Sequence, residues 1–334
     1  MPDETPFAVA SSRTDSITIA HYGLGPIGLG IAALAVDRGY RPVAAIDIEP
    51  KKVGRDLGAL LDRGTLGVTV TNDAAAALAA HPRVVLHSTQ SRLAQVTPQL
   101  LAIIEAGASV ISTCEELAFP WYHHAQDARR IDEAATARGV TVVGLGINPG
   151  FVMDLLPIVL TAPCREIRAV HVTRVVDAGL RRLPLQRKVG AGMTRVEFED
   201  GVASGRIGHV GLKESVAMIA DALGWRLDSI DERIEPVLDG GTVRGLHQVA
   251  TGRRREHPGS TDALPVTLDL TMAIGASNPR DAVTLDGDPP ITMTVAGGIH
   301  GDVATCALAV NALPRVLAAP PGLITVHSLP PIHG

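Results

Sequence analysis

The chain has 334 residues, which is long enough for two domains that each bury a core. Its net charge of −5, with no basic stripe and no clustered aromatic residues, argues against a nucleic-acid partner. No run approaches the roughly eighteen uncharged apolar residues of a membrane span, and the longest, FVMDLLPIVLTAP, contains Asp154. We therefore expect a soluble protein.

The N-terminal stretch is polar and lacks the pattern of a signal peptide, so we expect a frayed terminus. The chain has three cysteines, Cys114, Cys164 and Cys306, and none of them has CxxC spacing. This odd number favours a protein of the reducing cytoplasm without a disulfide framework. We predict no metal site, because the adjacent His123 and His124 would point different ways on a helix.

Residues 17–47 predict a strand, a glycine turn, a helix and a second strand that ends at Asp47. Gly23 allows the tight exit from the strand, Gly25 lets a pyrophosphate approach the backbone, and Gly28 lets the helix pack closely on the sheet. Asp47 follows the last glycine by nineteen residues and can accept hydrogen bonds from ribose hydroxyls. The motif predicts a dinucleotide site that includes the turn residues Gly23, Gly25, Pro26, Ile27 and Gly28.

Residues 49–62 indicate a helix whose basic residues lie just beyond Asp47. Asp47 favours NAD, whereas Lys51, Lys52 and Arg55 lie where a 2′-phosphate would sit and leave NADP open. A solvated helix face explains these basic residues equally well.

The next segments continue the alternation of strand and helix. Residues 83–89 form an apolar strand ending in Ser88 and Thr89, which we expect to face the cofactor. Helices are predicted over residues 96–105 and 122–138, with strands over 108–113 and 140–146. Five strands alternating with helices predict an α/β fold with a doubly wound parallel sheet, the Rossmann arrangement.

From residue 167 the pattern changes to long β-type runs, interrupted clearly only by a helix over residues 209–224. These runs predict an α+β domain with a mixed or antiparallel sheet, whose open face is usually covered by helices or by a partner subunit, so we expect a homodimer. A final helix over residues 302–317 and the segment after it return to the first domain. The expected divisions are a dinucleotide-binding domain over 1–150, a substrate-binding and dimerisation domain over 151–301, and a C-terminal segment over 302–334.

Residues 112–122, STCEELAFPWY, place Glu115 and Glu116 just past a parallel strand, at the edge where a nicotinamide would lie. A glutamate shielded by the apolar residues that follow would have a raised pKa and could move protons near neutrality. Neighbours in an extended turn point to opposite sides, so only one of the two can face the cleft. A carboxylate that interacts with a helix dipole is an equally good reading.

Residues 144–154, GLGINPGFVMD, connect the two domains. Asn148 offers hydrogen-bonding groups beside the apolar Pro149, Phe151 and Met153, which suits a small-molecule pocket. A hinge alone would explain the glycines and the proline.

Taken together, several segments resemble the 2,4-diaminopentanoate dehydrogenase family, which includes native amine dehydrogenases and is related in fold to dihydrodipicolinate reductase. The resemblance runs from Ile17 to about Leu323 and rests on these segments: GLGPIG, DIEPKKVGRDLG, STCEELAFP, GINPGFVMD, RVVDAGLRRLPLQRKVGAG, GHVGLKES, NPRDAV and GGIHGDVAT.

The resemblance implies NAD(P)H-dependent reductive amination of a ketone or aldehyde with ammonia, and the reverse oxidative deamination of a primary amine. It implies Glu115 as the catalytic acid/base, with Glu116 as second choice, and a mostly apolar pocket at the domain junction that includes Asn148, Pro149 and Phe151. We also expect Glu116 and Met153 at this substrate pocket, and Asn148 in contact with the cofactor. Ligand contacts or ion pairs across an interface are open for Arg174, Asp177, Gln186 and Lys188.

Two other functions are weighed. A dihydrodipicolinate reductase-like imine or C=C reductase would need cations for a dicarboxylate, which Arg181, Arg182, Arg187 and Lys188 could supply. A non-catalytic NAD(H)-binding sensor would need no acid/base.

Overall fold

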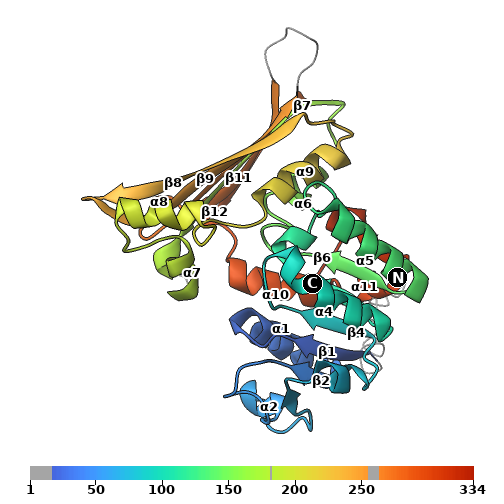
Figure 1. The fold of residues 1–334 in the computed structure, drawn as a ribbon. Helices are drawn as coiled ribbons and strands as arrows, with labels where there is room; N and C mark the ends of the chain where they lie inside the picture. The colour runs from blue at the N-terminus through green and yellow to red at the C-terminus, as the bar shows by residue number, and fades with distance from the viewer. Residues whose placement is uncertain (1–16, 181–182, 255–262) are drawn as a thin grey trace, which may run out of the picture.

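The computed structural model describes residues 17–180, 183–254 and 263–334. Its first sheet has seven parallel strands in the order β13-β6-β5-β4-β1-β2-β3. Strands β6, β4, β1 and β2 of this sheet are labelled in Figure 1. The chain runs outward from β1 through β2 and β3, then returns to start again at β4, so the order reverses between β1 and β4. The strands are β1 (Thr18–Tyr22), β2 (Arg41–Ile46), β3 (Val70–Thr71), β4 (Val84–His87), β5 (Ser109–Ser112), β6 (Thr141–Gly144) and β13 (Gly322–Ile324).

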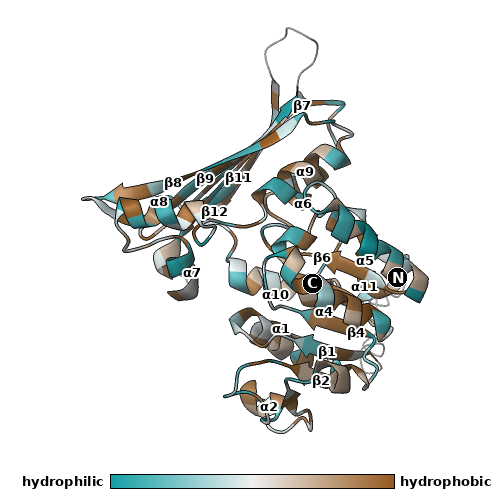
Figure 2. Ribbon diagram, in the orientation of Figure 1, coloured by the Kyte–Doolittle hydropathy of each residue, from teal (hydrophilic) through white to brown (hydrophobic). Residues whose placement is uncertain are grey.

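Helices cover both faces of this sheet. Two neighbouring residues of β1 point to opposite faces. Ile19 belongs to the core beneath α1 and α10, and Ala20 belongs to the core beneath α4 and α5. Apolar runs fill the strands (Figure 2), as expected for a sheet buried on both sides. The helices are α1 (Pro26–Asp37), α2 (Leu57–Leu60), α3 (Ala74–Leu78), α4 (Leu93–Glu105), α5 (Ala125–Arg138), α10 (Gly301–Asn311) and α11 (Leu313–Ala318), with short 3₁₀ turns η1 (Glu115–Leu117) and η3 (Val326–Ser328).

The second sheet has six strands in the order β12-β11-β7-β10-β9-β8. Only β7 and β10 pair in parallel and every other pair is antiparallel, so the sheet is mixed. The predicted fold class is confirmed. The strands are β7 (Glu166–Asp177), β8 (Ser229–Asp239), β9 (Thr242–Arg254), β10 (Ala263–Ala273), β11 (Arg280–Asp288) and β12 (Ile291–Ala296).

Helices α8 (Arg195–Ala203) and α9 (Leu212–Ala222) pack against one face of the second sheet (Figure 1). On β7, Val170 and Val172 face these helices and are buried, whereas His171 between them is exposed. The remaining helical elements of this part are α6 (Leu155–Leu160), α7 (Leu183–Lys188) and η2 (Ala178–Leu180).

Two of the predicted helices are wrong in extent. Within residues 49–62 only α2 is α-helical, because Gly54 has a φ of +84° and the Asp56 carboxylate accepts backbone N–H groups from Gly58 on one side and Gly67 on the other. The helix over 302–317 is two helices, α10 and α11, since Pro314 in the first turn of α11 lacks the N–H that a continuous helix would need. Strand β11 and helix α8 were not predicted, although Thr194 and Glu197 form a capping box at the start of α8.

The C-terminal segment lies with the first sheet, where β13 pairs with β6 and α10 packs on α1. The domain boundaries at 150 and 301 stay predictions. No helix in the described part of the chain is long and apolar enough to cross a membrane. Cys114, Cys164 and Cys306 are free thiols.

Candidate active site

The glycine turn lies at the carboxyl end of β1, next to the point where the strand order reverses. A Cβ on Gly28 would lie 1.9 Å from the Gly23 carbonyl oxygen, so only glycine permits this packing. A Cβ on Gly25 would meet nothing within 4 Å, because Gly25 faces open space in a cavity. Gly25 also caps α1 without a side chain, which leaves first-turn N–H groups available. The turn fits the pyrophosphate of a dinucleotide.

Asp47 follows β2 and organises the loop beyond it. Its carboxylate accepts a hydrogen bond from the Leu24 backbone N–H (2.6 Å) and another from the Glu49 backbone N–H (2.8 Å). Lys52 Nζ lies 3.6 Å from Asp47 and 2.6 Å from Glu49, whereas Lys51 is exposed and outside the cavity lining. Of the predicted basic residues, Lys52 is therefore the one beside Asp47.

Ser88 and Thr89 follow β4 and line the same cavity. The Ser88 hydroxyl donates to the Gly23 carbonyl oxygen (2.9 Å), and the Thr89 hydroxyl donates to Gln99 Oε1 (2.8 Å). The first bond joins the ends of β4 and β1, the two strands that flank the reversal, and the second ties the end of β4 to α4.

The cavity has a volume of about 380 Å³ and lies between the two sheets. One side is the glycine turn with Pro26, Ile27, Ser88 and Thr89. The other side comes from β7, β10, α7 with the residue after it, and the turn before α9, and it combines apolar residues with Arg174, Lys188 and His209. Its apolar residues are Val176, Leu185, Val189, Leu270 and Met272.

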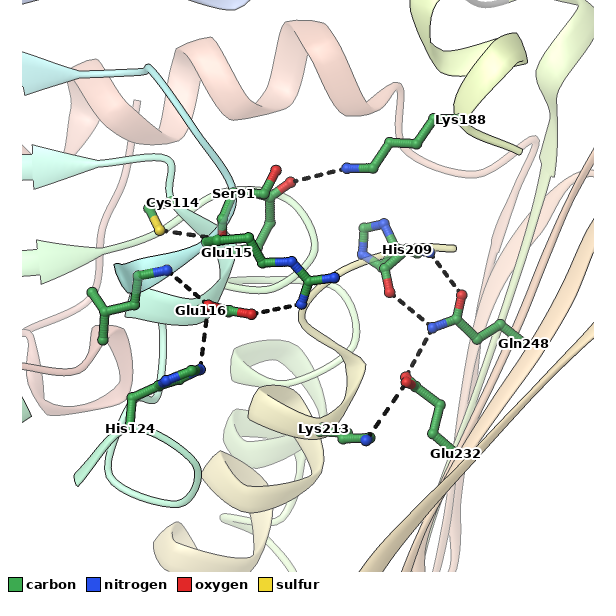
Figure 3. A network of polar contacts seen from close by, with 12 residues as sticks. Ser91, Cys114, Glu115, Glu116, His124, Lys188, His209, Lys213, Glu232 and Gln248 are labelled. Atoms are coloured by element: carbon green, nitrogen blue, oxygen red, sulfur yellow. Dashed lines mark hydrogen bonds and ion pairs between the residues drawn. The ribbon is translucent and has the colours of Figure 1, made fainter. Parts of the chain in front are cut away.

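Glu115 begins η1, directly after β5, and lines this cavity. Its side chain is 23% exposed, and its Oε1 lies 3.8 Å from Lys188 Nζ of α7 (Figure 3). A Cβ on Gly211, before α9, would lie 3.3 Å from Glu115 Cβ and 2.4 Å from Pro149 Cδ, so the two parts of the chain meet closely here. The structure thus brings Glu115, Asn148 and Pro149 to one cavity with the glycine turn.

Glu116, predicted as a pocket residue, points elsewhere. Its carboxylate is buried and accepts hydrogen bonds from Arg92 Nη1 and from the Leu93 backbone N–H, both at 2.7 Å. His124 Nε2 lies 3.2 Å from it (Figure 3). The start of α4 therefore holds Glu116, and this fixes its neighbour Glu115 on the cavity side.

Phe151 and Met153 lie outside the described cavity lining, and their assignment to the substrate pocket stays a prediction. Met153 is fully buried in the core, and Phe151 packs against that core, outside the cavity lining among the described residues. The reason is the fold of the connection: the buried Asp154 carboxylate accepts hydrogen bonds from the Gly150 backbone N–H and the Ser215 hydroxyl, both at 2.8 Å, which turns this segment away from the cavity.

Four further residues had open roles. Arg174 lines the cavity, but its guanidinium is buried and donates to Asp281 Oδ1 of β11 (2.7 Å). Asp177 accepts hydrogen bonds from the Gly179 and Gly275 backbone N–H groups, and Gln186 is not part of the lining. Lys188 lines the cavity beside Glu115. Arg181 and Arg182 lie outside the described residues.

His209 and its partner Gln248 were missed by the sequence reasoning. His209 lines the cavity from the turn before α9, and burial together with the charges of Lys188 and Arg174 lowers its pKa to about 3. A signal was present, because a histidine flanked by Gly208 and Gly211 precedes a clear helix. Among the described residues, no group of three or more histidine, cysteine or acidic side chains could hold a metal ion.

Comparison with known proteins gives consistent results. Residues 151–334 match the family described as the 2,4-diaminopentanoate dehydrogenase C-terminal domain. The chain is 31% identical to a 2,4-diaminopentanoate dehydrogenase of Acetoanaerobium sticklandii over 95% of this chain and 94% of that protein. It is 26% identical to an amine dehydrogenase of Streptomyces virginiae over 94% of this chain and 96% of that protein.

Among solved structures, the amine dehydrogenase of Mycobacterium smegmatis matches with a TM-score of 0.84 and 25% identity, over 96% of this chain and 97% of that one. The arrangement of both sheets is therefore shared along almost the whole length.

Proposed function

Since the chain belongs to the 2,4-diaminopentanoate dehydrogenase family, and is thus an NAD(P)-dependent oxidoreductase, we propose that it catalyses the reductive amination of a ketone or aldehyde with ammonia and the reverse deamination of a primary amine. The observation that carries the proposal is a carboxylate, Glu115, in the same cavity as the glycine turn and beneath an apolar wall. A redox step next to a proton-transfer group is what this chemistry needs.

We assign Glu115 the acid/base role. As a carboxylate it takes a proton from ammonium, which frees ammonia to attack the carbonyl carbon, and it passes this proton to the carbonyl oxygen. It then takes a second proton from the attached nitrogen and returns it to the hydroxyl, which leaves as water as the carbinolamine becomes an iminium cation. As a carboxylate again, it stabilises the iminium cation. When bound, NAD(P)H supplies the hydride that reduces this cation. Lys188 Nζ lies 3.8 Å from Glu115 Oε1, so a cation stands beside this carboxylate in the cavity.

The apolar wall has a role of its own. Val176, Leu185, Val189, Leu270 and Met272 exclude water from the reacting carbon. An imine is hydrolysed by water, so a dry cavity between the two sheets preserves it until it is reduced.

For the cofactor we infer a preference for NAD over NADP. The Asp47 carboxylate after β2 would repel a 2′-phosphate, and Lys52 beside it is already paired with Asp47 and Glu49. Asn148 and Thr89 are the proposed neighbours of the nicotinamide half, because both line the cavity beyond the glycine turn.

The test is spectrophotometric. NADH and NADPH oxidation are followed with a panel of short ketones and aldehydes, with and without ammonium, and the reverse reaction is followed with short amines and diamines at alkaline pH. We expect turnover that requires ammonium. Turnover that is independent of ammonium would favour the dihydrodipicolinate reductase-like alternative, and NADH binding without turnover across the panel would favour a sensor.

We also propose a homodimer formed through the face of the second sheet opposite α8 and α9. Residues of this face, such as His171, Thr173 and Thr271, alternate with buried ones along their strands. The short side chains of Thr173 and Thr271 leave room for a second copy to pack on this face. Light scattering is expected to give twice 34.9 kDa. A charge on this face, Val249→Asp on β9, is expected to yield the monomer, and a wild-type monomer would contradict the proposal.

A further inference from the structure

The backbone of His209 is held on both sides by one buried side chain. Gln248 of β9 is fully buried, its Oε1 accepts a hydrogen bond from the His209 backbone N–H (2.8 Å), and its Nε2 donates to the His209 carbonyl oxygen (2.8 Å). The same Nε2 donates to Glu232 Oε1 (2.8 Å), which lies near Lys213 (Figure 3). A buried amide that satisfies both peptide groups of a turn residue fixes where that residue's side chain points.

The ring of His209 points toward the part of the cleft that holds Lys188 and Glu115 (Figure 3). Gly211, two residues later, packs against Glu115 and Pro149, so the His209 turn and the start of η1 are neighbours. Lys188 lies close to both side chains, since it is 3.8 Å from Glu115 and its charge acts on His209.

Two buried polar atoms of this lining have no hydrogen-bond partner among the described residues: His209 Nε2 and Asn148 Oδ1. Buried polar atoms without partners are rare in folded proteins, and in a cavity they indicate hydrogen bonds that a ligand completes. With the pKa of His209 near 3, its imidazole is neutral at any working pH and keeps one nitrogen that accepts a hydrogen bond.

Several hydrogen-bond acceptors that line one part of a cavity favour a ligand with hydrogen-bond donors. Glu115 offers carboxylate oxygens, Asn148 an amide oxygen and His209 a ring nitrogen. Ammonia, a primary amine and an iminium group each present N–H donors, and the iminium group also carries positive charge, which a protonated histidine would repel.

We propose that His209 is a second hydrogen-bonding residue for the reacting nitrogen, alongside Glu115, and that it takes part in binding ammonia in the cavity. This inference rests on the proposed amine chemistry. The two residues then have different roles in one cavity. Glu115 transfers protons, and His209 positions the reacting nitrogen.

The test compares substrates in one variant. His209→Leu removes both ring nitrogens and keeps an apolar side chain of similar reach. We expect its KM for ammonium to rise about tenfold or more, the usual effect of losing one hydrogen bond, with an unchanged Kd for NAD(P)H by fluorescence titration. His209→Asn keeps an acceptor and is expected to fall between wild type and His209→Leu. The control His123→Ala removes an exposed histidine outside the lining and should leave every constant unchanged.

Several outcomes decide the matter. An unchanged KM for ammonium in His209→Leu overturns the proposal, as does an equal rise in the KM values for ammonium, carbonyl substrate and NAD(P)H, which a purely structural role would produce. If His209→Leu does not bind NAD(P)H, His209→Ala is measured in its place with the same criteria. A wild-type enzyme without ammonium-dependent turnover refutes the proposed function itself, whereas an active wild type with normal His209 variants refutes only this inference.

Discussion

The two sides of the cavity are built in different ways. The side that we propose for the cofactor comes from the ends of adjacent strands β1, β2 and β4, where Asp47 and Ser88 each form a hydrogen bond with the glycine turn Gly23–Gly28. The substrate side is assembled from α7, the turn before α9, β7 and β10, with Glu115 at its edge. The first side is therefore formed by strand ends that are neighbours in one parallel sheet. The second side forms only when segments far apart in the sequence pack together.

The largest loss of turnover is expected for Glu115, which lies where the two sides of the cavity meet. Glu115→Gln keeps the shape of the side chain but removes the proton carrier, so we expect turnover to fall at least about a hundredfold, the usual scale for a general acid/base. NAD(P)H affinity should be unchanged, because the glycine turn is untouched. Steady-state kinetics with fluorescence titration measures both.

Its matched control is the neighbouring carboxylate. Glu116→Gln weakens the ion pair with Arg92 and should cost stability, but turnover should fall less than tenfold because Glu116 does not reach the cavity. Equal losses of turnover in the two variants would remove the distinction between them.

This pair also shows what a sequence can and cannot predict. The glycine turn and Ser88 were predicted because a strand, a turn and a helix in succession determine their positions. The local pattern did not distinguish Glu115 from Glu116, and only the family resemblance favoured Glu115. In the structure Glu116 is held by Arg92 and the Leu93 N–H, some two dozen residues earlier in the chain. The position of His209 is set by hydrogen bonds from Gln248, which lies 39 residues later in the chain. A local sequence pattern does not predict a contact between residues so far apart.

A smaller effect is expected on the cofactor side. Gly25 has a φ of −64°, which alanine adopts freely, and its Cβ would meet no protein atom within 4 Å. Gly25→Ala should therefore leave the free energy of unfolding without cofactor unchanged, while the added methyl group takes the space of the pyrophosphate and raises the Kd for NAD(P)H about tenfold or more. Gly107→Ala, at a φ of +81° after α4, is the control: it should lose stability and keep cofactor affinity. Unaltered affinity in Gly25→Ala would argue against a cofactor there.

Substitutions at Asp47 and Lys52 are expected to change the preference between NADH and NADPH without a general loss of activity. Asp47→Asn removes the charge and keeps one acceptor for the loop, so we expect the ratio of kcat/KM for NADPH to that for NADH to rise several-fold, within about tenfold. Lys52→Ala, which removes the cation beside Asp47, should move the ratio in the other direction. A ratio that neither variant changes would mean that this loop does not distinguish the two cofactors.

The smallest effect on turnover is expected for Glu214, a buried residue in the first turn of α9 on the substrate side. Burial raises its pKa to about 7, with Glu116 and Glu232 acting in the same direction and Lys213 against it. An acid whose pKa is higher in the folded than in the unfolded chain binds its proton more tightly when folded. The folded state therefore loses stability as pH rises from about 4.5 through 7, by about 3 kcal/mol at pH 8. Glu214→Gln removes this titration, so denaturant unfolding at pH 5 and pH 8 should show a clearly larger gain for the variant at pH 8 than at pH 5, with kcat unchanged. An equal difference at both pH values would mean that Glu214 ionises in the folded protein as it does in the unfolded chain.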